Sequence, residues 1–92
     1  MVNRGDVIKH KAAMDTAIQV MIFTRDPSTS NYIVRGVWIN MGQTQSFPIA
    51  TEEYPVGIPA EFFIKPEHLS NWLKCTKPKS KFVRKEDWKP IA

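Results

Sequence analysis

Two segments with strand character, joined by a polar turn, constrain the fold of this chain more than any other part of its sequence. Residues 17–24 (AIQVMIFT) are rich in β-branched and large apolar side chains, and both alternating faces of the segment are mostly apolar. Residues 32–40 (YIVRGVWIN) have the same character, and residues 26–31 (DPSTSN) between them have the composition of a turn. The pattern predicts two long strands, the first covered on both faces, or on one face with a partner on the other.

The remaining elements that the sequence predicts are short. They are strands at residues 6–11, 43–50 and 61–64, a loop at residues 51–59, and a single helical turn from about residue 66 to residue 72. Gly36, within the second long segment, indicates a bulge or a bend, and Pro48 places its segment at a sheet edge or at a bend. Together these features predict an all-β fold: a small SH3-like barrel of four to five short antiparallel strands with a single helical turn.

Length and composition set the scale of the molecule. The chain has 92 residues, of which 42% are hydrophobic and 24% charged, so we expect one small globular domain rather than a disordered chain. No apolar run approaches the roughly 20 residues that span a bilayer, and charged residues occupy the place of a signal-peptide core. A single cysteine, Cys75, cannot form an internal disulfide. These features predict no membrane segment and a cytoplasmic location, or the host cytoplasm or virion if the chain is phage-encoded.

The positive charge of the chain is concentrated near its C-terminus. Residues 74–92 contain seven basic and two acidic side chains, a net charge of +5, whereas residues 1–73 carry a net charge of −1. This division predicts a near-neutral β-barrel at residues 1–73 and a basic C-terminal arm at residues 74–92. Such an arm suits an acidic partner, either a protein surface or a nucleic acid.

Four short motifs resemble those of a known class of small domains. They are Gly5–Lys11 (GDVIKHK), Ile18–Met21 (IQVM), Val34–Trp38 (VRGVW) and Phe63–Leu69 (FIKPEHL). Residues 4–72 resemble the small uncharacterised SH3-like barrels of bacteria and their phages, and depart from that class in a longer loop at residues 51–59. The resemblance implies an SH3-like fold and a non-enzymatic role, but the class has no common activity that implies a mechanism.

The residue types that catalysis and metal binding require do not converge in the sequence. The two histidines, His10 and His68, have no Asp, Glu or Cys at a metal-ligand spacing, and one cysteine cannot build a structural zinc site. No serine lies in a nucleophile-elbow motif, and the four glycines are scattered rather than gathered in a phosphate-binding loop. We therefore expect no enzymatic activity, no metal, no cofactor and no small-molecule substrate.

The C-terminal arm supplies the predicted partner-binding residues. They are Lys77, Lys79, Lys81, Phe82, Arg84, Lys85, Trp88 and Lys89. The basic side chains can contact phosphates or an acidic protein surface, and the aromatic ones can anchor a partner or stack on unpaired bases. Two interpretations of Trp88 remain open: it anchors a partner, or it folds back with Phe82 and packs on the barrel. We expect Trp38 to fill the barrel core and Trp72 to cap an open end.

These features favour a non-enzymatic interaction module that binds through the barrel surface and the arm. It would serve as a structural or accessory component of a protein assembly, with another protein or further copies of the chain as its partner. The alternative is a nucleic-acid-binding protein that uses the same arm, with Arg35, Lys9 and Lys11 extending the basic patch if the strands bring them to one face. A third and less favoured hypothesis is an inhibitor of a host enzyme.

Overall fold

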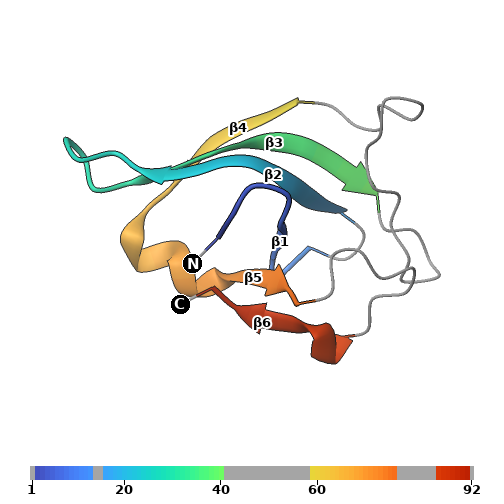
Figure 1. The fold of residues 1–92 in the computed structure, drawn as a ribbon. Helices are drawn as coiled ribbons and strands as arrows, with labels where there is room; N and C mark the ends of the chain where they lie inside the picture. The colour runs from blue at the N-terminus through green and yellow to red at the C-terminus, as the bar shows by residue number, and fades with distance from the viewer. Residues whose placement is uncertain (1, 14–15, 41–58, 77–84, 92) are drawn as a thin grey trace.

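The computed structural model describes residues 2–13, 16–40, 59–76 and 85–91, and these residues form one antiparallel β-sheet (Figure 1). Its strands are β1 (Val7–His10), β2 (Thr16–Arg25), β3 (Tyr32–Asn40), β4 (Pro59–Ile64), β5 (Trp72–Cys75) and β6 (Trp88–Pro90), and two 3-10 helices are η1 (Pro66–Asn71) and η2 (Lys85–Asp87). The strand order is β4-β3-β2-β1-β5-β6. The sheet is curled, so that β3 and β4 lie above β1 and β5 in Figure 1, and η1 joins the two levels.

The β2–β3 hairpin is the longest paired element of the sheet and confirms the two strands predicted from the sequence. Its register runs from Thr16 opposite Asn40 to Arg25 opposite Tyr32. The Asp26 carboxylate stabilises the turn by accepting hydrogen bonds from the backbone N–H of Ser28 at 2.9 Å and from its hydroxyl at 2.7 Å. These bonds, the hydroxyl first, lower the pKa of Asp26 below its ordinary value. Local polar side chains therefore form the turn, as their composition indicates.

A bulge in β2 changes which of its side chains face inward. The register shifts between Val20 and Ile22, so one extra residue, Met21, lies in β2 opposite the continuous β3. The sequence alternation placed Ile22 on the same face as Val20, but Ile22 is 44% exposed because the extra residue reverses the alternation beyond this point. Gly36 lies opposite Val20, and a Cβ atom at Gly36 would collide with a backbone carbonyl of β2. The predicted irregularity therefore lies in β2, next to Gly36 rather than at it.

Buried apolar side chains cover both faces of the sheet. The inner core consists of Val2, Ile8, Ile18, Val20, Val34, Ala60, Ile64 and Leu69. The outer core consists of Val7, Ala17, Ile39, Cys75 and Trp88. Consecutive residues of one strand enter different cores, as Ala17 and Ile18 do in β2, because strand side chains alternate between faces. The prediction that this segment is covered on both faces is confirmed for its first half.

The C-terminal part of the described chain belongs to the same sheet. The boundary predicted between residues 73 and 74 falls inside β5, and β6 pairs with β5 so that Trp88 lies opposite Cys75. Thr76 fixes the residue before β6 next to the end of β5, because its N–H and its hydroxyl both donate to the carbonyl of Asp87, at 2.8 and 2.9 Å. Residues 85–91 are therefore part of the folded sheet rather than a separate arm.

The all-β prediction is confirmed, and the predicted helical turn is present as η1. The sequence did not predict β5 and β6, since their pairing joins β1 to segments far along the chain. The hydrogen-bonded sheet has two ends, β4 and β6, among the described residues. The predicted strand at 43–50 and residues 51–58 of the predicted loop lie outside the described residues.

Candidate functional site

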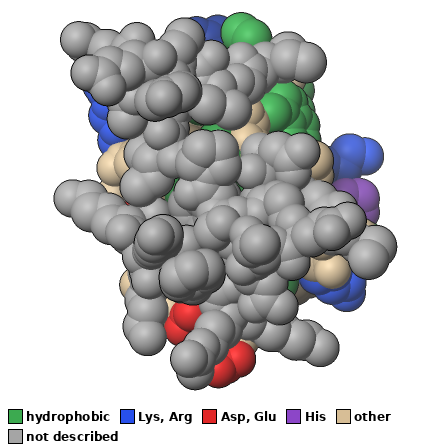
Figure 2. Space-filling model, turned by 90° about the vertical axis from the view of Figure 1, so that its right-hand side faces the viewer, with side chains coloured by type: hydrophobic (Ala, Val, Ile, Leu, Met, Phe, Trp, Pro, Cys, Tyr) green, Lys and Arg blue, Asp and Glu red, His purple; other side chains and the backbone are tan. Residues whose placement is uncertain are grey.

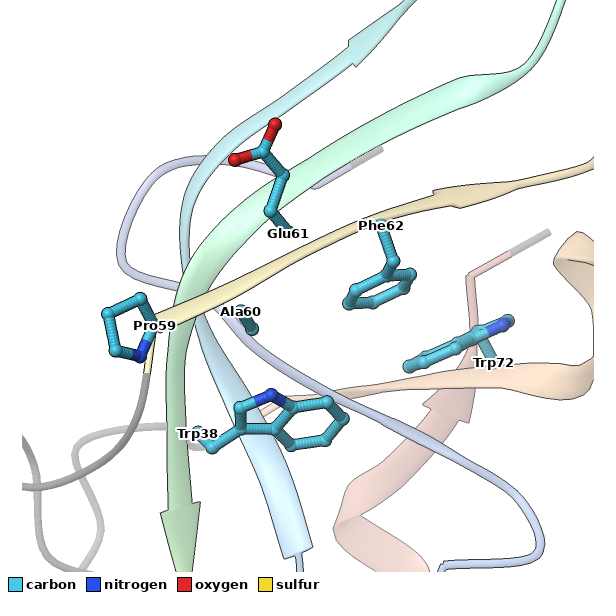
Figure 3. A pocket seen from close by; sticks show the side chains of 6 residues that line it. All are labelled: Trp38, Pro59, Ala60, Glu61, Phe62 and Trp72. Atoms are coloured by element: carbon cyan, nitrogen blue, oxygen red, sulfur yellow. The ribbon is translucent and has the colours of Figure 1, made fainter.

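A pocket of about 370 Å³ opens between β4 and β5, two strands that are not neighbours in the sheet order. Its lining is Trp38, Pro59, Ala60, Glu61, Phe62 and Trp72 (Figure 3). Trp38 comes from β3, the next four residues from β4, and Trp72 from the first position of β5. The curl of the sheet brings these residues together across the sequence.

Three aromatic rings form a row along this pocket. The ring centroids of Trp38 and Phe62 are 6.2 Å apart, and those of Phe62 and Trp72 are 5.2 Å apart. Both pairs have an interplanar angle of 21°, so the three rings are nearly parallel. His10 packs edge-on against Trp72 at 5.5 Å and supports the far end of the row. We call Trp38, Phe62 and Trp72 the aromatic row.

The aromatic row is only partly covered by the protein itself. Phe62 and Trp72 are half-buried and pack against the inner core, whereas Trp38 is 36% exposed. The expectation that Trp38 fills the core is therefore corrected: among the described strands β4 and β5 do not pair, and Trp38 lies in the pocket between them. Within the described part of the chain, neither indole N–H donates a hydrogen bond to a protein acceptor.

Charge is sparse around the pocket. Glu61 is the one ionisable residue among the described residues of the lining, and its carboxylate lies 3.2 Å from the guanidinium of Arg35 on the neighbouring strand. Both side chains of this ion pair are more than half exposed, so the pair adds little to stability. The described lining residues include no lysine and no arginine. The pocket therefore presents apolar aromatic surface and N–H donors, without a cation to hold a phosphate.

The residues predicted to bind a partner have different positions. Lys77, Lys79, Lys81, Phe82 and Arg84 lie outside the described residues. Lys89 is exposed on β6, and Lys85 begins η2. Trp88 is only 9% exposed and belongs to the outer core, and the ammonium group of Lys9 lies 4.7 Å from the centroid of its ring. Of the two interpretations of Trp88, the structure shows the one in which it folds back onto the sheet.

Two of the cations proposed to extend a basic patch lie on strands that are not adjacent. Lys9 lies on β1 opposite Leu73, whereas Arg35 lies on β3 opposite Glu61, and β2 separates the two strands. On the face drawn in Figure 2, the coloured Lys and Arg side chains lie around the edge of the view, at its left, right and top.

The described residues contain no group of three or more side chains that could hold a metal ion. His10 is engaged locally, because its Nδ1 accepts a hydrogen bond from the N–H of Ala12 at 3.0 Å. None of the described helices has the length and the apolar character that crossing a membrane requires.

Sequence reasoning did not single out Phe62, although it occupies the centre of the aromatic row. The alternation of Ala60, Phe62 and Ile64 with polar or exposed neighbours was the available signal, since it puts Phe62 on the buried face of β4. Comparisons with protein families, with curated proteins and with solved structures found no match to this chain.

Proposed function

We propose that this protein is a non-enzymatic interaction module, a structural or accessory component of a protein assembly, that binds a polypeptide segment in the pocket between β4 and β5. The observation that carries the proposal is the partly exposed aromatic row. Stacked, rigid aromatic side chains offer large contact area with little loss of rotamer entropy, and they are typical anchors of protein interfaces. The indole N–H groups of Trp38 and Trp72, both in the pocket lining, supply donors for peptide carbonyl oxygens.

The fold supports the same proposal. The sheet is curled, and β5 returns beside β1 after one short 3-10 helix, η1. This arrangement is expected of an SH3-like barrel, and we propose that fold for the chain. The contact between Phe62 and Trp72 joins the two levels of the sheet where β4 and β5 do not pair. In small barrels an unpaired seam lined by apolar side chains is a natural entrance for a ligand.

A protein partner fits the pocket better than a nucleic acid does. Phosphate contacts dominate nucleic-acid affinity and require lysine or arginine side chains. The lining contains neither, and the nearest described guanidinium, that of Arg35, is already paired with Glu61. The basic residues of the C-terminal segment, Lys77 to Lys89, would then act at the margin of the complex by attracting an acidic partner surface. Trp88 has no part as an anchor in this proposal because it is buried in the outer core.

The test is a selection from a displayed library of random peptides on the immobilised full chain, followed by calorimetric titration of the selected peptides. Replacing Trp38 by alanine should weaken the selected peptides at least about tenfold, which corresponds to the loss of an interface anchor. Met21→Ala is the matched control, since Met21 is 49% exposed and lies on β2, away from the pocket lining.

A parallel titration with labelled single- and double-stranded DNA and RNA addresses the nucleic-acid alternative. Binding that falls by about tenfold or more between roughly 50 and 200 mM salt, and that survives Trp38→Ala, would contradict the proposal and favour phosphate recognition. Selected peptides whose affinity does not depend on Trp38 would also contradict it.

A further inference from the structure

The outward-facing row of β4 carries an acid, an aromatic ring and a base at successive positions. Glu61, Phe63 and Lys65 alternate with the inward-facing Phe62 and Ile64, and all three are exposed. Lys65 follows the last residue of β4, but its backbone is still extended, with φ −68° and ψ 145°. The row therefore continues through Lys65 with the spacing of a strand.

This row lies on an end of the sheet. β4 pairs with β3 on one side, and no described strand pairs with its other side. A strand edge of this kind is a template for another strand, because its outward backbone N–H and C=O groups have no ladder partner among the described strands. Phe63, which is 64% exposed, is the most exposed of the large hydrophobic side chains described. An open edge that also carries an exposed ring is the surface most suited to a further strand.

We infer that two copies of the chain associate by antiparallel pairing of β4 with β4, around a two-fold axis that passes through Phe63. In this register Phe63 lies opposite Phe63 of the second copy, and Glu61 lies opposite Lys65 of the second copy, twice by symmetry. Aromatic pairs and pairs of opposite charge are the cross-strand neighbours that stabilise an antiparallel ladder. The order acid, aromatic, base is thus complementary to itself when the strand is reversed.

The neighbouring registers lack this complementarity. An axis at Glu61 would place the two Glu61 carboxylates opposite each other, which is destabilising. An axis at Phe62 would place Glu61 opposite Phe63 and Lys65 opposite Pro59, so no charge would face its opposite. With the axis at Phe63, Pro59 falls outside the paired residues 61–65, where its missing N–H does no harm.

The pairing would leave the pocket on one common face of the two copies. Residues opposite each other in an antiparallel pair lie on the same face, so Phe62 would lie opposite Ile64 of the second copy, and both inner faces would point the same way. The association uses the outward row and the backbone edge, and its existence does not depend on what the pocket binds. The partner is a second copy of the chain because an identical strand that runs antiparallel supplies the charges in the reversed order.

The test measures the mass of the full chain in solution by sedimentation equilibrium over a range of concentrations. Wild-type protein should form a concentration-dependent dimer. The variants Glu61→Lys and Lys65→Glu should each dimerise at least about tenfold more weakly, because each places two like-charge pairs across the axis. Mixing these two variants should restore the dimer as a heterodimer, since both cross-strand pairs then have opposite charges again.

Met21→Glu is the matched control, because it introduces a charge at an exposed apolar residue on β2, away from the edge. It should leave the dimer unchanged, and circular dichroism should show that all variants keep the β-sheet. A wild-type chain that stays monomeric up to about 1 mM, the weak limit of the usual affinity scale, would overturn the inference. Failure of the two charge variants to associate with each other would overturn it too, as would loss of the dimer in Met21→Glu.

Discussion

The two ends of the sheet carry the same kind of residue in opposite surroundings. At the β6 end, Trp88 is 9% exposed, and it packs in the outer core with Cys75. At the β4 end, Trp38 is 36% exposed in the wall of the pocket, and Phe63 is 64% exposed on the outward row. At the β6 end the strand pairs with β5, whereas among the described residues the side chains of the pocket and of the outward row at the β4 end are partly or largely exposed. The position of a strand in the sheet, rather than the residue type, thus decides which large apolar side chains are buried in the fold and which stay exposed.

The largest effect that we expect separates the two ends directly. Trp88→Ala should lower the free energy of unfolding by about 3–5 kcal/mol, because it removes a buried ring from the outer core and leaves a cavity beside Cys75. Phe63→Ala, which removes an exposed ring at the other end, should change it by less than about 0.5 kcal/mol in dilute monomeric protein. Chemical denaturation of the two variants measures both values, and equal losses would show that the comparison is false.

The second effect concerns the hairpin that both ends share. Gly36→Ala should lower the free energy of unfolding by about 1–3 kcal/mol, because the added methyl group collides with the backbone carbonyl of Gln19 in β2. The clash is with backbone, so a side-chain rotation cannot relieve it. Val37→Ala, at the next position of β3, serves as a comparison that keeps the close approach intact. If Gly36→Ala were as stable as the wild type, the strands would not approach as closely as described.

The third effect should appear in binding more than in stability. Trp38→Ala should lower the free energy of unfolding by about 1–2 kcal/mol, since a partly exposed ring loses less burial than Trp88 does. The same variant should weaken peptides selected for the pocket at least about tenfold. Thermal unfolding and calorimetric titration of one preparation measure the two quantities. A Trp38→Ala protein as unstable as Trp88→Ala would place Trp38 among the core residues.

The smallest effect is at the hairpin turn, far from either end. Hydrogen bonds from Ser28 lower the pKa of Asp26 in the folded protein below its ordinary value of 3.8. The stabilising contribution of the carboxylate is therefore fully present above pH 3.8 and is lost as the pH falls through the lowered pKa. Asp26→Asn should remove this part of the pH dependence. Unfolding measured at a series of pH values from about 5 to about 2 detects the difference, and identical curves would contradict it.

The parts of the fold that sequence reasoning predicted are those that depend on neighbouring residues. The hairpin of residues 16–40 follows from two β-rich segments and a turn whose side chains bond to their own backbone. The η1 turn follows from Pro66 at its start. Each of these signals lies within a few residues of the element that it specifies.

Features that depend on distant pairing were not predicted. The strand β6 is three residues long, and its sequence, Trp88-Lys89-Pro90, has no strand pattern of its own; its partner β5 makes it a strand. The charge of the surrounding segment favoured a binding arm, and charge alone does not show that Trp88 is buried. The pocket was missed for the same reason, since Trp38 and Trp72 meet Phe62 only after the sheet has curled.

Because β2 contains one extra residue, the face on which a side chain lies depends on whether it comes before or after that residue. Up to Val20 the even-numbered side chains face the inner core, and beyond Met21 the odd-numbered ones do. Phe23 therefore packs on the inner core, while Ile22 is exposed. Removing Met21 would restore the regular alternation and leave the later side chains of the strand on their present faces. Ile22 and Phe23 would keep their partners in β3. Loss of one residue at the bulge should therefore be tolerated far better than loss of one residue from the regular first half of the strand.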